Sequence, residues 1–116
     1  MAKILFNGVP TAQIDFEYTP DSDLPVILNL TGTAYSITDN RVIGYKLFID
    51  GALVTTAKIF SNGNQTHRVL NAGLASYSFP FVVKNDEVQP VAIRIEPMNS
   101  DTAHDVNDDV ALTLFN

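Results

Sequence analysis

The sequence predicts one all-β domain, a sandwich or a barrel of about nine short strands with no convincing helix. Val, Ile and Thr make up 30 of the 116 residues, and β-branched side chains pack well on a pleated sheet but lose rotamer freedom in a helix. Short apolar or alternating runs recur between clusters of Pro, Gly, Asn and Asp, which is the rhythm of a sandwich or barrel. A chain of this length has room for a single domain, residues 1–116.

The first strands are predicted at residues 3–6, 11–18 and 25–30, separated by turns at residues 7–10 and 19–23. In the second of these strands Ile14, Phe16 and Tyr18 alternate with Asp15 and Glu17, so one face is buried and the other is wet. The third is apolar on both faces and needs cover on both sides.

A hairpin is predicted where residues 42–49 and 52–60 flank Asp50-Gly51, because both central residues of a type I′ turn need positive φ. A two-residue loop pairs Phe48 with Leu53 on one side of this hairpin and Leu47 with Val54 on the other. Neither side is purely polar, and a two-layer sandwich buries only one of them internally. We therefore expect the second apolar set to be covered either by a loop or by another subunit, with four interface candidates: Phe48, Leu53, Ala57 and Ile59.

The second half is predicted to contain a turn at residues 61–64, a strand at 65–70, a turn at 71–73 and strands at 75–83, 88–95 and 110–114. Pro80 inside residues 75–83 indicates an edge strand or a bulge, because proline cannot donate to a ladder.

Composition excludes several function classes. The net charge of −6 leaves no basic patch for nucleic acid or for an anionic membrane. The absence of Cys excludes a disulfide framework and a thiolate metal site. Residues 1–8 carry one positive charge and a three-residue apolar run, too short for a signal peptide, so we expect folding in a cytoplasm. No cofactor motif is present.

We expect no enzymatic activity, because the residues that chemistry needs do not form a recognisable motif. A triad of Ser61, His67 and an aspartate lacks a nucleophile elbow and a Gly-rich oxyanion loop. We expect His67 instead to pack against a loop or to bind a carbonyl group at a sheet edge. The acids Glu17, Glu87 and Glu96 show no spacing that singles out a glycosidase pair.

One acidic loop is the candidate for a metal site. Within residues 101–109 it holds Asp101, Asp105, Asp108 and Asp109, and such oxygen ligands suit Ca²⁺, but the spacing of an EF-hand is absent. His104 is a possible Zn²⁺ ligand without enough partners. Turn capping through Asx-turns is the preferred interpretation, so no metal is expected.

Carbohydrate binding is the alternative function. Lectin sites combine an aromatic platform with Asn and Asp side chains, and Tyr35, Tyr45 and Tyr77 together with the Asn-rich turn offer both. Tyrosines at sheet margins with their hydroxyl groups in water are the more ordinary interpretation.

Residues 45–116 resemble small jelly-roll modules of the tumour-necrosis-factor and C1q-like type found in phage and bacterial proteins. The resemblance rests on strand and turn rhythm in YKLFIDGALVTTAKIFSN (45–62), Thr66-His67-Arg68 and NDDVALTL (107–114). It implies an antiparallel β-sandwich of jelly-roll type, for which we expect about 8–9 strands, and a homotrimer. It also implies a structural protein of a phage particle, a capsid decoration or fibre-head domain that is assembled in the host cytoplasm and contacts the major capsid protein or another virion protein. A small lectin that binds a glycan is the alternative.

Overall fold

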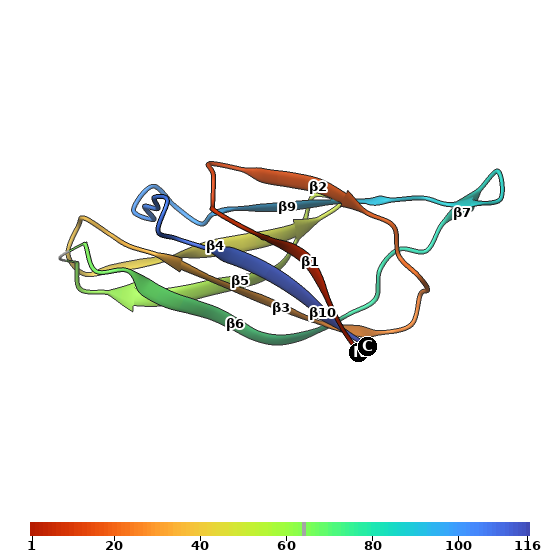
Figure 1. The fold of residues 1–116 in the computed structure, drawn as a ribbon, viewed down its shortest axis with the longest axis horizontal. Coiled ribbons are helices and arrows are strands. Elements are labelled where there is room, and N and C mark those ends of the chain that lie inside the picture. Colours follow the sequence, from red (N-terminus) through yellow and green to blue (C-terminus); the bar gives the residue numbers. More distant parts are fainter. Residues whose placement is uncertain (64) are drawn as a thin grey trace.

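The computed structural model describes residues 1–63 and 65–116 and contains ten strands and no helix in that part of the chain (Figure 1). No described segment is a helix long and apolar enough to span a membrane. The strands are β1 (Ala2–Gly8), β2 (Ile14–Tyr18), β3 (Val26–Ala34), β4 (Arg41–Ile49), β5 (Ala52–Ser61), β6 (Arg68–Tyr77), β7 (Val83–Lys84), β8 (Glu87–Val88), β9 (Val91–Pro97) and β10 (Val110–Phe115).

Two four-stranded antiparallel sheets pack face to face. Their strand orders are β1-β10-β3-β6 and β2-β9-β4-β5, and β7 and β8 form a separate hairpin. Apart from the β4–β5 hairpin, successive long strands alternate between the sheets, and the last two long strands are inserted between the early ones, which is the double Greek key of a jelly roll. The prediction of an all-β, antiparallel sandwich of jelly-roll type is confirmed. Eight of the ten strands make up the two sheets, and the two short strands β7 and β8 form the small hairpin, which the sequence rhythm did not reveal.

The core lies between the sheets and takes alternate residues from every long strand. In β4 the inward side chains are Ile43, Tyr45, Leu47 and Ile49, all at most 1% exposed. Leu28 and Leu30 of β3 face them together with Leu112 and Leu114 of β10, which pair with the same strand. Because the side-chain period of a strand is two, this inward set leaves a second, outward set on each sheet.

The β4–β5 hairpin turns at Asp50-Gly51, where both residues have positive φ, +48° and +81°. As predicted, Ile49 pairs with Ala52 and Phe48 with Leu53. The next pair is Leu47 with Thr55, so Val54 is an extra residue in β5, which is a β-bulge.

The bulge moves the rest of β5 to the opposite face, and this corrects two of the four interface candidates. Ala57 pairs with Tyr45 and is fully buried, and Ile59 pairs with Ile43 and packs against the core. Only Phe48 and Leu53 lie on the outer face as expected. A one-residue shift exchanges the two faces of a strand, and a period-two pattern alone does not reveal it.

A second bulge joins two predicted strands into one. The expected turn at residues 71–73 lies inside β6, where Thr31 pairs with Asn71 and Asn29 with Leu74. The side-chain amide of Asn29 donates to Asn71 Oδ1 and to the carbonyl oxygen of Gly73, both at 2.9 Å. Gly73 has a φ of +76°, a conformation that glycine adopts without strain, so the Asn-Ala-Gly signal marks a bulge and not a chain reversal.

The segment after β6 leaves the sandwich. Phe79 is 4% exposed and lies against the rings of Tyr18 and Tyr77, each at a centroid distance of 5.1 Å. Beyond it the chain extends past the end of the sandwich as the β7–β8 hairpin and returns at Val91, which is buried (Figure 1). The strands predicted at residues 75–83 and 88–95 are therefore each divided, with Pro80 at the point where the first one leaves the sheet.

The loop of residues 98–109 closes the opposite end of the sandwich and replaces a missing ladder partner. β9 accompanies β4 only as far as the pair Tyr45 and Pro97. Past that point the hydroxyl group of Thr102 accepts a 3.0 Å hydrogen bond from the backbone N–H of Gly44, and Asn99 donates to the carbonyl oxygen of Val42 at 2.8 Å. The same loop bridges to the other sheet through Tyr35 and Ala103.

Candidate functional site

The loop of residues 98–109 brings two carboxylates to a histidine that is far away in the sequence. His67 Nδ1 lies 2.6 Å from Asp108 Oδ1, and His67 Nε2 lies 3.6 Å from Asp105 Oδ2. The Asp108 side chain is fully buried, and its Oδ2 accepts a 2.8 Å hydrogen bond from the backbone N–H of Asp105. The imidazole also lies against Tyr35, with a centroid distance of 4.7 Å. His67 thus packs against a loop, as expected.

Electrostatics favour the charged form of this histidine. The hydrogen bond with Asp108 raises the pKa of His67, partial desolvation opposes the rise, and the negative charges of Asp108 and Asp105 add to it. An imidazolium can donate to both carboxylates, whereas a neutral ring donates from one nitrogen only. The cluster therefore joins the β5–β6 connection to the loop of residues 98–109 most firmly when His67 is protonated.

The acidic loop does not bring together all four aspartates that were considered as candidate metal ligands. Asp105 and Asp108 lie together with His67, within 4.8 Å of one another. Asp101 instead faces Arg41 at 3.6 Å, and the backbone N–H of Asp109 donates to Thr33 Oγ1. Among the described residues, neither Asp101, Asp109 nor His104 belongs to a metal-sized cluster.

The predicted turn capping is present in the same loop. Asp105 Oδ1 accepts a 2.8 Å hydrogen bond from the backbone N–H of Asn107, which is an Asx-turn. Both oxygens of Asp108 are already occupied, one by His67 and one by the N–H of Asp105. The donor set is thus arranged as a histidine–carboxylate ion pair.

The same geometry gives no support to the Ser61 triad. Both ring nitrogens of His67 face carboxylates, so neither of them faces a serine hydroxyl group. Ser61 is buried and its Oγ accepts a hydrogen bond from the N–H of Gly63. The turn predicted at residues 61–64 includes Asn64, which lies outside the described residues.

The three tyrosines considered for sugar stacking do not share one surface. Tyr45 is 1% exposed, its hydroxyl group donates to the carbonyl oxygen of Thr33 at 2.8 Å, and burial followed by the charge of Asp108 raises its pKa. Tyr35 packs on His67, and Tyr77 packs on Phe79 near the other end of β6. Phe79 was not anticipated as an anchor, although an aromatic residue directly before a proline is a usable signal.

The outward side chains of the two sheets differ in charge. We call the outer side of β2-β9-β4-β5 the charged face, because alternation and pairing place six ionisable side chains on it: Asp15, Glu17, Lys46, Lys58, Arg94 and Glu96. Phe48 and Leu53 lie on the same face, with Val42 and Phe60 at its other end.

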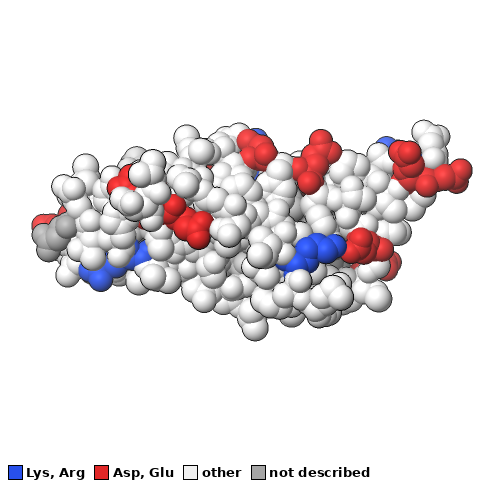
Figure 2. Space-filling view, viewed as in Figure 1, with Lys and Arg blue, Asp and Glu red and all other residues white. Residues whose placement is uncertain are grey.

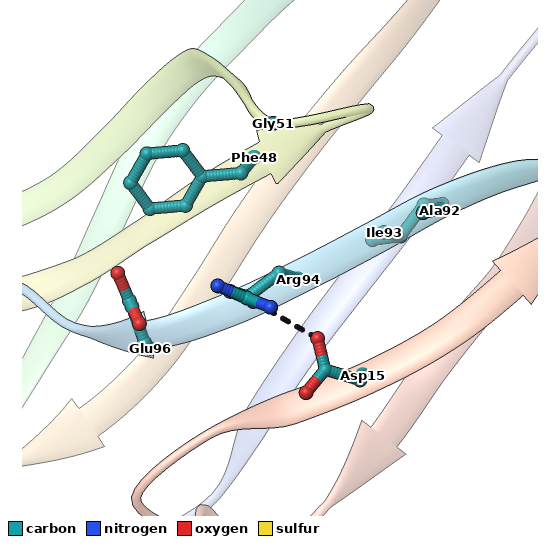
Figure 3. A pocket seen from close by; sticks show the side chains of 7 residues that line it. All are labelled: Asp15, Phe48, Gly51, Ala92, Ile93, Arg94 and Glu96. Atoms are coloured by element: carbon teal, nitrogen blue, oxygen red, sulfur yellow. Dashed lines mark hydrogen bonds and ion pairs between the residues drawn. The ribbon is translucent and has the colours of Figure 1, made fainter.

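A hollow of about 220 Å³ opens on the charged face. Side chains from β4 and β9 surround it, with Phe48 on one side and Arg94 and Glu96 on the other (Figure 3). Arg94 Nε donates to Asp15 Oδ1 at 2.9 Å, and hydrogen bonds from Gln13 and then from Arg94 lower the pKa of Asp15. The exposed residue Ala92 lines the hollow, so its surface is partly apolar and its rim is charged.

The outer side of the other sheet, which we call the neutral face, carries no ionisable side chain within its strands; Asp109, which lies opposite Thr33 just before β10, marks its end. Alternation and register place these residues on it: Ala2, Ile4, Asn7, Ile27, Asn29, Thr31, Thr33, Val69, Asn71, Leu74, Ser76, Ala111, Thr113 and Phe115. Ile4, Val69 and Leu74 are 66%, 74% and 74% exposed. In Figure 2 several acidic side chains lie along the upper margin and on the projecting hairpin, while the lowest part of the view is white.

This segregation of charge was not predicted from the sequence, although the signal is present. Every second residue in β1, β3, β6 and β10 is neutral, but this becomes a continuous surface only once the pairing of the four strands is known. No family model matches the chain, and no curated protein matches it.

Proposed function

We propose that this chain is a non-enzymatic structural protein of a phage particle, a capsid decoration or fibre-head domain that acts as a homotrimer. The neutral face carries the proposal. The chain has a net charge of −6, yet the four strands of one sheet carry no ionisable side chain on their outer face, and charged residues are depleted at the core of protein–protein interfaces. The face suits burial against the major capsid protein or another virion protein.

The size of the face agrees with this role. Four strands spaced by about 4.8 Å and about six residues long at about 3.3 Å per residue cover roughly 400 Å² of flat area. Side-chain relief and the neighbouring loops increase the accessible surface beyond that flat area. A stable interface buries about 800 Å² on each partner, so the face supplies the centre of an interface and its surrounding loops the rim.

A shallow hollow on the neutral face offers a place for a partner side chain. It is lined mainly by Pro25, Val26, Ile27 and Phe115 beside Ser76. Its apolar lining lies close to the two chain ends, where the backbones of Met1 and Asn116 are joined by hydrogen bonds. One end of the face is therefore apolar, and its middle carries Asn and Thr side chains for hydrogen bonding.

The proposal is tested with particles purified from the native source and with two matched threonine variants. Thr31 lies in the middle of the neutral face, and Thr56 lies opposite Lys46 on the charged face. Mass spectrometry should find the protein in the particles. Thr31→Lys should reduce binding of added protein to stripped particles tenfold or more, because a buried unpaired charge costs several kcal/mol, and Thr56→Lys should bind as the wild type does. Absence from the particles, together with a monomer at micromolar concentration, would contradict the proposal.

A further inference from the structure

We propose that the β7–β8 hairpin is an arm that docks into the hollow on the charged face of a neighbouring copy of this chain, and that this contact builds the homotrimer. The inference rests on the homotrimer of the proposed function and specifies its contact. We define the arm as residues 81–90. It uses the hollow that Phe48, Ala92 and Arg94 line on the neighbour.

The arm exposes apolar side chains to solvent, which gives a single chain no stability. Phe81, Val82 and Val83 are consecutive and are 37%, 46% and 55% exposed, and no residue of the arm is buried. A run of three exposed apolar residues is a liability unless it has a function. An isolated two-stranded hairpin is also marginally stable in water, and β7 and β8 contribute two residues each. A partner surface removes both disadvantages.

The arm is nevertheless built to hold one shape. At its tip Asn85 and Asp86 both have positive φ, +53° and +63°, as a type I′ hairpin turn requires. The N–H of Gln89 donates to the carbonyl oxygen of Val82 at 2.8 Å. At its base Phe79 and Val91 are buried in the sandwich. A preorganised arm loses less conformational entropy on docking than a flexible loop does.

The arm points away from its own hollow. In Figure 1 it extends past the end of the sandwich along the long axis, whereas the hollow lies on the sheet between β9 and the start of the β4–β5 turn. Reaching that hollow within one chain requires the arm to fold back over the sheet. A second copy receives it without any change of conformation.

The hollow matches the arm in size and chemistry. A cavity of about 150 Å³ accepts a benzene ring, so a hollow of about 220 Å³ has room for the ring of Phe81. Phe48 offers a ring for an aromatic contact, and Arg94 offers a guanidinium group for a cation–π contact.

Charges along the two surfaces also match in spacing. Asp86 and Glu87 at the tip of the arm have no ion-pair partner among the described residues, and the same holds for Lys46 and Lys58. Phe81 lies five residues from Asp86, about 17 Å in an extended chain. On the receiving face Lys58 pairs with Gly44, four residues along β4 from Phe48, about 13 Å. Phe81 in the hollow thus brings the acidic tip close to Lys58, past Lys46, which is two residues or about 7 Å from Phe48 along β4.

This contact joins two different patches of one protein, so it is heterologous and closes into a ring when three copies complete the rotation. A heterologous contact makes a sharp prediction for mixtures of variants. A chain with a defective arm still offers its hollow, and a chain with a defective hollow still offers its arm, so a mixture of the two regains one junction.

The experiment measures mass by sedimentation velocity for the full chain and three variants. The wild type is expected at three times the chain mass of 12.7 kDa. The arm variant Phe81→Asp/Val83→Asp and the hollow variant Ala92→Arg are each expected at the monomer mass. An equimolar mixture of these two variants is expected to give dimers. Leu24→Asp, which changes an exposed leucine outside both surfaces, should remain a trimer.

Two further variants keep the test decisive if a substitution disturbs folding. Replacing residues 82–89 by two glycines removes the arm and leaves the sandwich, whose circular dichroism spectrum should stay that of a β protein. Ala92→Ser, which leaves the hollow open, should assemble as the wild type does. A trimeric arm variant overturns the inference but leaves the homotrimer in place, as does a mixture that stays monomeric. A trimeric arm variant that no longer binds particles assigns the arm to another virion protein instead, and a monomeric wild type removes both the homotrimer and the arm contact.

Discussion

Replacing Thr102 by Val should destabilise the protein by about 2 kcal/mol, although the two side chains have nearly the same shape. Thr102 Oγ1 accepts a 3.0 Å hydrogen bond from the N–H of Gly44 and donates to Asn99 Oδ1 at 2.8 Å. Gly44 is buried, and β9 no longer accompanies β4 there. Loss of the hydroxyl group leaves this N–H without a partner, which costs about 1–3 kcal/mol. Asn99 Oδ1 keeps its bond from the N–H of Thr102, so it adds little.

The assay is urea unfolding followed by circular dichroism, because the chain contains no Trp. A loss of about 2 kcal/mol in the free energy of unfolding corresponds to a fall in Tm of about 8 °C for a domain of this size. Thr113→Val on the neutral face is the control, and it should change the free energy of unfolding by less than about 0.5 kcal/mol. A Thr102→Val variant as stable as that control would refute the view that the loop of residues 98–109 completes the β4 ladder.

Three further predictions concern the ion pair, a close backbone approach and the core. Because the folded-state pKa of His67 is raised, the ion pair stabilises the fold fully below pH 6.5, and this stabilisation declines as the pH rises through the folded-state pKa. The difference in the free energy of unfolding between the wild type and His67→Gln should therefore shrink between pH 6 and pH 9. A difference that grows with pH would contradict the ion pair. Gly44→Ala should cost about 3 kcal/mol in chemical unfolding, because a Cβ atom there collides with the backbone of Ala57, and an unchanged urea midpoint would show that β5 can shift. Leu112→Ala, which truncates a fully buried side chain, should lower the free energy of unfolding by about 3 kcal/mol. Leu74→Ala, at a position that is 74% exposed, should change it by less than about 0.5 kcal/mol in thermal unfolding. Equal losses would mean that Leu74 is already buried against a partner in the species that unfolds.

The fold class followed from the sequence because its signals are local. β-branched composition, turn residues and period-two alternation act within a few residues, and the Asp50-Gly51 turn placed the pairs of Phe48 and Ile49 correctly. The bulge at Val54 could not be predicted from these local signals, because its position depends on packing between strands. That one residue moved Ala57 from the expected outer face into the core.

The candidate sites depended on contacts between distant segments, and sequence patterns gave only parts of them. Asp105 and Asp108 were recognised in the acidic loop, but their partner His67 is 41 residues from Asp108. The arm was hidden because residues 75–83 and 88–95 alternate like strands. The structure shows that residues 81–90, from the end of the first segment to the start of the second, leave the sandwich. The neutral face was hidden because it consists of ordinary residues, and only the absence of charge across four strands distinguishes it.

The insertion of β10 between β1 and β3, and of β9 between β2 and β4, has a consequence for biosynthesis. When the first ninety residues have left the ribosome, β1 and β2 have no neighbour in their sheets, because both neighbours are still to be translated. Native closure must therefore wait until β9 and β10 have been made, and pairing across such sequence separations is slow. A chain interrupted before Val110 would lack the strand that joins β1 to the rest of its sheet, so a damaged message would give a product that exposes two open sheet edges to chaperones and proteases.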